Sequence, residues 1–195
     1  MHTPELAITA VSAPGTEIDG TGPGGERFLD SRRIDGTLPE MLHDALSFCA
    51  RNMKVRTATD PVTGMRPEQT EYPQRAVREA ILNALIHRDC SENSEGTPVQ
   101  VALFTDMLEV RSPGMLCGGL TEGDLGNAGA VIRNEWLASM AQDLMGMGKR
   151  NSGIRGIRRE MAAAGLPPPL FRNLRDEFTV TLFNGTRGAR HSQKK

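Results

Sequence analysis

The stretch from Pro73 to His87 constrains the fold more than any other part of this 195-residue chain. Proline can occupy a first helical turn without losing a hydrogen bond, and apolar residues then recur at helical spacing. These apolar residues are Val77, Ala80, Ile81, Ala84 and Leu85. The pattern predicts an amphipathic helix that buries one face against a core.

The opposite face of this helix is polar. At roughly 100° per residue, Glu79, Asn83 and His87 fall within about 80° of one another. An amide oxygen is a hard, neutral ligand suited to magnesium, and a carboxylate can orient or deprotonate an attacking water. The face is therefore compatible with a phosphate site that uses magnesium. By spacing alone, an ordinary solvated helix surface is the commoner explanation.

Other local patterns predict the remaining elements. Thr37-Leu-Pro-Glu40 reads as a capping box that opens a helix from about 38 to 52. Asn134 and Ser152 are suitable N-caps for two later helices. Alternation of apolar and polar residues predicts strands, with turns between them. The predicted strand pairs are Val99–Leu103 with Leu108–Val110, and Leu170–Leu174 with Phe178–Phe183. Val55–Thr57 and Val62–Met65 are compatible with a short hairpin or with an irregular excursion.

Glycine-rich and proline-rich stretches mark the irregular parts of the chain. Between Pro113 and Val131 the glycine density disfavours regular structure and predicts a long, mobile loop with one helical turn at Thr121–Leu125. A similar composition from Ser12 to Glu26 buries too little apolar surface to offset the entropy of ordering it. We therefore expect a flexible segment at 1–25, one domain at 26–184 and a disordered basic tail at 185–195.

Charge and cysteine content narrow the function classes. The formal net charge of −1 and the pI of 6.4 do not indicate a basic surface that would bind nucleic acid or an acidic membrane. Cys49, Cys90 and Cys117 form no CxxC pair, so neither a disulfide framework nor a zinc site is indicated. No leader and no membrane-length apolar run is found, which predicts a soluble, cytoplasmic protein.

Three side chains are not assigned to a binding site. Trp136 and Met140 stand at helical spacing, which is more typical of a core than of a binding stripe. Arg88 is interpreted as part of a solvated surface, because most basic side chains are exposed.

A longer pattern resembles the histidine-kinase-like ATPase domain of RecG-related, Schlafen-like bacterial regulators, over about residues 26 to 184. The segments that carry the resemblance are Tyr72-Pro73, Arg78-Glu79-Ala80-Ile81, Asn83-Ala84-Leu85-Ile86-His87-Arg88-Asp89, Pro98-Val99-Gln100-Val101, Leu108-Glu109-Val110, Ser112-Pro113-Gly114, Arg133-Asn134 and Ser152-Gly153-Ile154. The resemblance implies an α+β fold, a two-layer sandwich with helices on one face of a mixed, mainly antiparallel sheet.

The resemblance also assigns roles on the polar helix face. Glu79 would be the general base and Asn83 the magnesium ligand, while His87 and Asp89 would line the same cleft. The implied cofactors are ATP and Mg²⁺. Ser112 stands where related ATPases have an aspartate that accepts the adenine amino group, and Gly114 would let the base approach.

Two glycine-containing segments would complete the nucleotide site. Gly118 and Gly119 belong to a loop that matches the family's lid, which closes over phosphate. Asn151, Ser152 and Gly153 match a turn that opens a helix, whose free amides can hold phosphate. Asn151 replaces a glycine there, and Ser152 is equally well explained as a plain N-cap.

The resemblance implies an ATP-binding, weakly hydrolysing regulatory domain of a cytoplasmic bacterial DNA-associated or transcriptional regulator. DNA contact would then run through other domains or partners, and a homodimer stays open. The alternative is a degenerate interaction or dimerisation domain that has lost its nucleotide. A helicase motor is not expected, because no G-x-x-x-x-G-K-[ST] phosphate loop is present.

Overall fold

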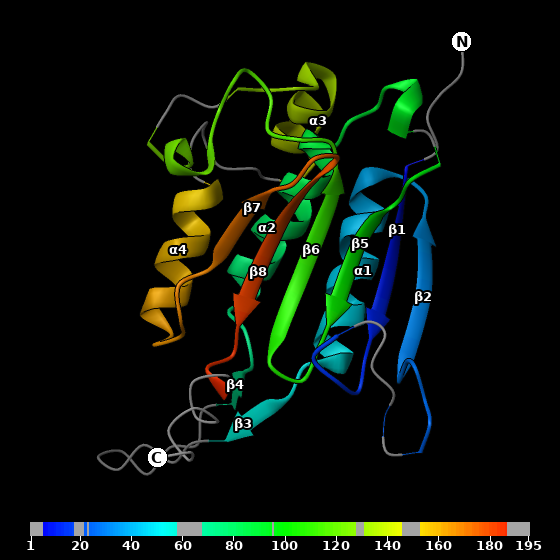
Figure 1. Ribbon diagram of the computed structural model, residues 1–195, viewed down its shortest axis with the longest axis vertical. Coiled ribbons are helices and arrows are strands. Elements are labelled where there is room, and N and C mark those ends of the chain that lie inside the picture. Colours follow the sequence, from blue (N-terminus) through cyan, green and yellow to red (C-terminus); the bar gives the residue numbers. More distant parts are fainter. Residues whose placement is uncertain are drawn as a thin grey trace.

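The computed structural model has two layers, with helices packed behind a six-stranded sheet (Figure 1). Within the described residues, neighbouring strands of this sheet are antiparallel except for one parallel pair. The strands in spatial order are β2 (Asp30–Asp35), β1 (Ala7–Ser12), β5 (Val99–Leu103), β6 (Met107–Pro113), β8 (Glu177–Phe183) and β7 (Leu170–Asn173), and the parallel pair is β1 and β5. The predicted α+β class is confirmed.

The structure describes most of the chain, but not all of it. The described residues are 6–17, 22, 24–57, 68–94, 96–127, 131–145 and 153–186. The helices in these ranges are α1 (Leu38–Asn52), α2 (Gln74–His87), α3 (Glu135–Met145) and α4 (Gly153–Ala163), and the short 3₁₀ turns are η1 (Glu92–Ser94) and η2 (Glu122–Asp124). The predicted basic tail lies outside the described residues from 187 onward.

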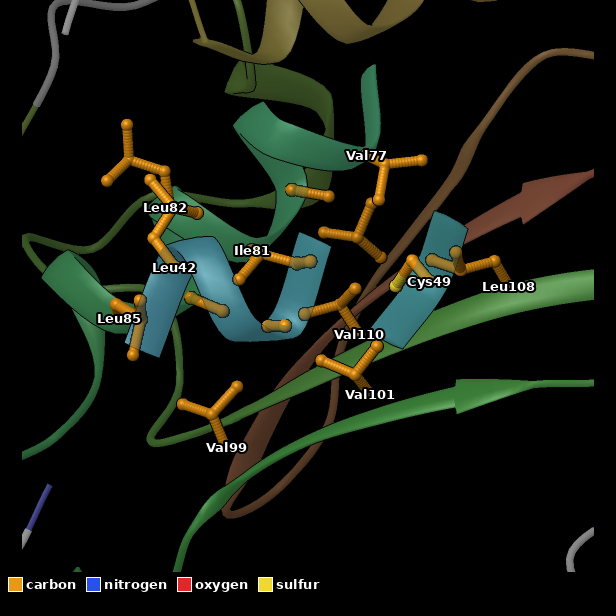
Figure 2. Packing of buried hydrophobic residues seen from close by; sticks show 14 of the residues in the cluster. Leu42, Cys49, Val77, Ile81, Leu82, Leu85, Val99, Val101, Leu108 and Val110 are labelled. Atoms are coloured by element: carbon orange, nitrogen blue, oxygen red, sulfur yellow. The ribbon is translucent and has the colours of Figure 1, made fainter. Parts of the chain in front are cut away.

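Helix α2 lies at the centre of the fold. Its buried side chains pack against α1 and against the strands β5 and β6 (Figure 2). Burial of one leucine or isoleucine side chain contributes about 1.5–3 kcal/mol, and α2 alone provides four fully buried ones. These four are Ile81, Leu82, Leu85 and Ile86. The helix is therefore held rigidly, and its polar face is fixed relative to the sheet.

Local sequence signals predicted most of the elements correctly. Thr37 and Glu40 form the capping box at the start of α1, with the Thr37 amide 2.9 Å from Glu40 Oε2. The β5–β6 and β7–β8 hairpins are both present. Strand β3 (Val55–Thr57) pairs with β4 (Glu68–Thr70), whereas the predicted partner at 62–65 lies outside the described residues.

The prediction of a flexible segment at 1–25 is wrong for β1. This strand lies inside the sheet between β2 and β5, and Ile8 and Ala10 are fully buried. Ile8, Thr9 and Val11 favour a strand, but the composition of the following residues outweighs this signal in the sequence analysis. The pairing that stabilises β1 involves β5, about ninety positions away in the chain. The domain therefore begins before residue 26.

Strand β2 was also missed by the sequence analysis. Its sequence is Asp-Ser-Arg-Arg-Ile-Asp, and Ile34 is its one buried residue. Charged residues are common on edge strands, where they discourage pairing with another chain. A strand of this kind has no apolar alternation for sequence analysis to detect.

Two structural interpretations of single residues are also wrong. Trp136 on α3 is 85% exposed and Met140 is 42% exposed, so neither belongs to the core. Arg88 is 1% exposed rather than solvated. Its guanidinium donates to the Thr97 carbonyl over 3.0 Å and to the Asp89 carbonyl over 3.3 Å. Arg88 thus ties the end of α2 to the segment that leads into β5.

Among the described residues, no helix combines the length and the apolar character that crossing a membrane requires.

Candidate functional site

The polar face predicted on α2 is present in the structure. Glu79, Asn83 and His87 are partly exposed, whereas the residues beside them on the other face of the helix are buried. The three side chains are spaced one helical turn apart, which is about 6 Å along the axis. They form a row that leads from the middle of α2 to its C-terminal end.

Glu79 has one carboxylate oxygen paired and one unpaired. Oε1 lies 3.2 Å from Arg78 Nη1, and the Glu79 side chain is 19% exposed. Oε2 is buried and has no hydrogen-bond partner among the described residues. A buried carboxylate oxygen without a protein donor is suited to accept a hydrogen bond from a water or a ligand.

Asn83 faces the first residue of α4. A Cβ placed on Gly153 would lie 2.7 Å from Asn83 Nδ2 and 3.0 Å from Oδ1. Nδ2 is buried and has no hydrogen-bond partner in the described part of the chain. Rotation of the amide about its last bond exchanges oxygen and nitrogen, so either atom can face the helix end. The glycine thus brings the positive end of α4 against the amide.

We expect Gly153→Ala to disturb Asn83, because a methyl group at Gly153 would push directly against the amide. Gly156→Ala is a matched control on the same helix, since a Cβ there meets nothing within 4 Å. Both substitutions raise helix propensity by up to about 1 kcal/mol. In thermal unfolding, Gly156→Ala should therefore raise the melting temperature and Gly153→Ala should not. Equal increases would show that Asn83 has room to move.

His87 lies near Arg133 at the end of the row. Burial lowers the pKa of His87 below its ordinary value of 6.5, and the positive charge of Arg133 lowers it further. The imidazole is therefore neutral at pH 7 and can donate one hydrogen bond and accept another.

The lowered pKa of His87 predicts a pH-dependent stability. Below about pH 6.5 the unfolded chain takes up a proton more readily than the folded one, so this contribution to stability is lost as the pH falls. The free energy of unfolding should decrease between about pH 7.5 and pH 5.5, and His87→Gln should make the slope shallower. His43→Gln, at an exposed position of α1, is the control. An unchanged slope in His87→Gln would contradict the prediction.

Asp89 follows α2 directly. Its Oδ1 accepts the Ser91 backbone N–H over 3.0 Å, and this hydrogen bond lowers the pKa of Asp89, to which the charge of Arg133 also contributes. Asp89 is therefore ionised at neutral pH. Its Cβ lies beside Gly114, 2.6 Å from the position that a Gly114 Cβ would take.

Gly114 is closely covered by Arg133. Its φ is +94°, and a Cβ there would lie 2.1 Å from Arg133 Nη1. The open side of Gly114, at which the sequence analysis expected a base to approach, is therefore in contact with a guanidinium. Arg133 Nη2 donates to the Met115 carbonyl over 2.5 Å. The structure thus brings Gly114, Asp89 and His87 together around Arg133.

Ser112 has a structural contact. Its hydroxyl donates to the Ala84 carbonyl of α2 over 3.0 Å, and the residue is 4% exposed. The hydroxyl links β6 to α2 between Asn83 and His87. The Ser112 hydroxyl can then meet a ligand only as an acceptor.

Sequence analysis missed two residues that shape this site. Arg133 and Asn134 lie far from α2 in the chain, yet the Asn134 amide donates to the carbonyls of Ile86 and Arg88, over 2.8 and 2.9 Å. These carbonyls belong to the last turn of α2, which lacks partners within the helix. Asn134 was predicted only as an N-cap of its own helix, and no local signal predicts this long-range contact.

The loop that contains Gly118 and Gly119 makes packing contacts and hydrogen bonds with other parts of the chain. Gly118 packs against Val131, whereas a Cβ on Gly119 would meet nothing within 4 Å. Farther along the loop, Arg158 of α4 donates to the Leu125 carbonyl over 2.8 Å. Arg155, also of α4, donates to the Gly126 carbonyl.

The predicted phosphate-binding turn is only partly described. Gly153 begins α4, while Asn151 and Ser152 lie outside the described residues. A separate pocket of about 340 Å³ lies near the start of β5 and the end of β6. Of the predicted site residues only Ser112 lines it, together with Thr97, Pro98, Gln100, Arg111, Pro113, Asp176 and Glu177. This pocket is therefore distinct from the polar row on α2.

The residues present are compatible with a magnesium ion that is held mainly by phosphate. No group of three or more His, Cys, Asp or Glu side chains in the described ranges could hold a metal ion. Mg²⁺ commonly uses one or two protein oxygens together with substrate phosphates and waters. The Asn83 amide and the unpaired Glu79 oxygen meet that requirement.

A comparison with solved structures supports the fold. A crystal structure of the DIP2311 protein from Corynebacterium diphtheriae is similar, with a TM-score of 0.72 and 24% sequence identity. The match covers 93% of this chain and 35% of that protein, so the present chain spans about a third of its length. At this identity the likeness concerns the fold alone. Among curated proteins, none matches this chain.

A family comparison supports the resemblance. Residues 96–182 match the family described as putative ATP-dependent DNA helicase RecG C-terminal. The matched segment extends from the strand β5 into β8 and includes Gly114 and Gly153, but it does not include α2. Over this segment the chain is therefore similar to the RecG C-terminal family that its sequence resembles.

Proposed function

We propose that this domain binds a nucleoside triphosphate, with ATP as the expected ligand, together with Mg²⁺ on the polar face of α2. The observation that carries the proposal is the pair of buried, unpaired polar atoms there, Glu79 Oε2 and Asn83 Nδ2. Leaving such atoms without partners costs free energy, so they are typical of positions where a ligand supplies the missing hydrogen bonds. The RecG-family match supports a nucleotide as that ligand.

The chain's own residues would act as follows. The Asn83 amide and the N-terminal turn of α4 would hold phosphate and its cation, since the two lie in contact. The unpaired Glu79 oxygen would accept a proton from an attacking water. Bound Mg²⁺ would withdraw charge from the phosphate oxygens. We propose slow hydrolysis that suits a regulatory cycle, with Glu79 as the base.

We propose a regulatory role in a bacterial DNA-associated or transcriptional regulator located in the cytoplasm. The net charge of −1 supports indirect rather than direct contact with DNA. Other domains or partners would supply that contact, as the greater length of the similar Corynebacterium protein allows. A homodimer is compatible with this role.

A second candidate is favoured by one specific observation. Arg133 covers Gly114, and the Ser112 hydroxyl is engaged by Ala84, so the base end of the predicted site is filled by the protein itself. This arrangement favours an interaction domain that keeps the fold without nucleotide.

A titration separates the two candidates. A ligand that binds only the folded state raises the melting temperature by mass action. Millimolar ATP with Mg²⁺ should therefore raise the melting midpoint under the first candidate and leave it unchanged under the second. Glu79→Ala should keep this shift and lose phosphate release. If Glu79→Ala hydrolyses ATP as fast as the unmodified protein, Glu79 is not the base.

A further inference from the structure

Helix α3 turns its largest apolar side chains toward solvent. Trp136 is 85% exposed and Met140 is 42% exposed, whereas the small residues Ala138 and Ala141 are buried. Ala138, Ala141 and the partly buried Leu137 belong to the main core. A helix that served only to pack on the core would bury its large apolar residues, because buried apolar area is what stabilises an amphipathic helix. The outward position of Trp136 and Met140 is therefore not explained by the fold.

The two exposed side chains lie on one stripe of α3. At roughly 100° per residue, Trp136, Met140 and Asp143 fall within about 60° of one another. Asp143 is exposed as well. Single exposed apolar residues are common on proteins, but positions i, i+4 and i+7 are the spacing at which a helix face meets a partner. Trp136 is also the only tryptophan of the chain, and tryptophan is enriched among the side chains that dominate binding energies.

Helix α3 presents this stripe from a fixed position. It packs against α1 and α2, and in Figure 1 it lies near the upper end of the molecule. Asn134, directly before α3, donates to the carbonyls of Ile86 and Arg88, so the start of the helix is tied to the end of α2. A partner therefore meets a rigid surface, which lowers the entropy cost of binding.

The charges around the stripe are acidic. Glu135 and Asp143 are both exposed, and α3 contains no Lys, Arg or His. A second copy of the same face would bring carboxylates together, and an anionic membrane would be repelled. A partner that carries basic residues beside apolar ones would be attracted. Charge complementarity thus favours a basic partner over a second copy of this chain.

We propose that the stripe formed by Trp136, Met140 and Asp143 docks an amphipathic helical segment of a partner protein, with Lys or Arg beside an apolar stripe. Trp136 and Met140 pack against the apolar residues of that segment, while Glu135 and Asp143 face its basic residues. Docking at this face requires no nucleotide. The inference therefore goes beyond the proposed function and can fail without it.

The single tryptophan makes this face directly observable, because burial of an exposed indole shifts its fluorescence emission to shorter wavelength. The probes are synthetic helical peptides without aromatic residues, which share leucines at positions i, i+3, i+4 and i+7 and carry either lysine or glutamate beside them. The lysine peptide should give a saturable blue shift with the nucleotide-free protein. The glutamate peptide should bind at least about threefold more weakly, and added salt should reduce the difference.

Exposed positions of α3 provide variants and a control that leave the core intact. Met140→Ala should weaken binding of the lysine peptide on the order of fivefold, whereas Gln142→Ala, outside the stripe, should not. Asp143→Asn should bring the affinities of the two peptides closer together. If Met140→Ala and Gln142→Ala bind the lysine peptide alike, the stripe is not the docking site.

The remaining results also decide the question. Absence of a saturable shift with the lysine peptide overturns the proposal, and so does equal binding of both peptides at low salt. A shift that grows with protein concentration alone would assign the face to a second copy. A shift on phosphatidylcholine vesicles without one on the peptides would assign it to a membrane. Either of the last two results would overturn a basic protein partner.

Discussion

Asn83→Ala is expected to abolish the magnesium-dependent part of nucleotide binding. At ligand concentrations of about 100 times the dissociation constant, binding stabilises a folded protein by about 2.7 kcal/mol. In Asn83→Ala, the melting midpoint with ATP should be the same with and without Mg²⁺. The reason is the position of Asn83. It lies in the same row on α2 as Glu79, whose Oε2 is unpaired among the described residues, and it faces the start of α4.

The same substitution should not weaken the protein without ligand. Nδ2 of Asn83 has no hydrogen-bond partner in the described residues, so losing this amide nitrogen breaks no hydrogen bond within that part of the chain. Alanine also has the higher helix propensity. Gln74→Ala, at an exposed position of the same helix, is the control and should keep the full response to Mg²⁺. A magnesium response that survives in Asn83→Ala would remove this residue from the site.

Gly114→Ala is expected to destabilise the fold by on the order of 2–3 kcal/mol. A φ of +94° is strained for any residue with a Cβ, which costs about 1–3 kcal/mol by itself. The added Cβ would also lie 2.1 Å from Arg133 Nη1, so the guanidinium must move. Denaturant unfolding measures this loss directly.

Gly119→Ala separates the two causes. Gly119 has a φ of +72°, but a Cβ there would meet nothing within 4 Å. It should therefore show the cost of the backbone conformation without the contact with Arg133. A loss in Gly119→Ala as large as that in Gly114→Ala would show that Arg133 moves away at little cost.

Elements with a local cause were predictable from the sequence. The α2 face depends on residues three and four apart, and the capping box of Thr37 and Glu40 depends on residues three apart. In contrast, β1 is stabilised by pairing with β5, and β2 has almost no apolar residues. Their formation depends on the assembled sheet, which a local pattern does not contain.

The candidate site also contains residues whose grouping was predictable from the sequence and residues whose contacts were not. Glu79, Asn83 and His87 share one face of one helix, so their grouping could be predicted from spacing. The contact of Arg133 with Gly114 and the bonds from Asn134 to the end of α2 join segments that are distant in the chain. Such contacts follow from tertiary packing. The same holds for the exposure of Trp136, because its helical spacing does not reveal which face of α3 is covered.

The most direct test of the account is to locate a bound metal–nucleotide complex on the domain. Mn²⁺ replaces Mg²⁺ and broadens the NMR signals of nearby nuclei. With Mn²⁺ and a purine nucleoside triphosphate, the backbone amide signals of Glu79, Asn83 and Gly153 should broaden first, while that of Ile34 on the edge strand β2 should persist. Broadening centred elsewhere, or broadening that does not require the nucleotide, would contradict a nucleotide site on the polar face of α2.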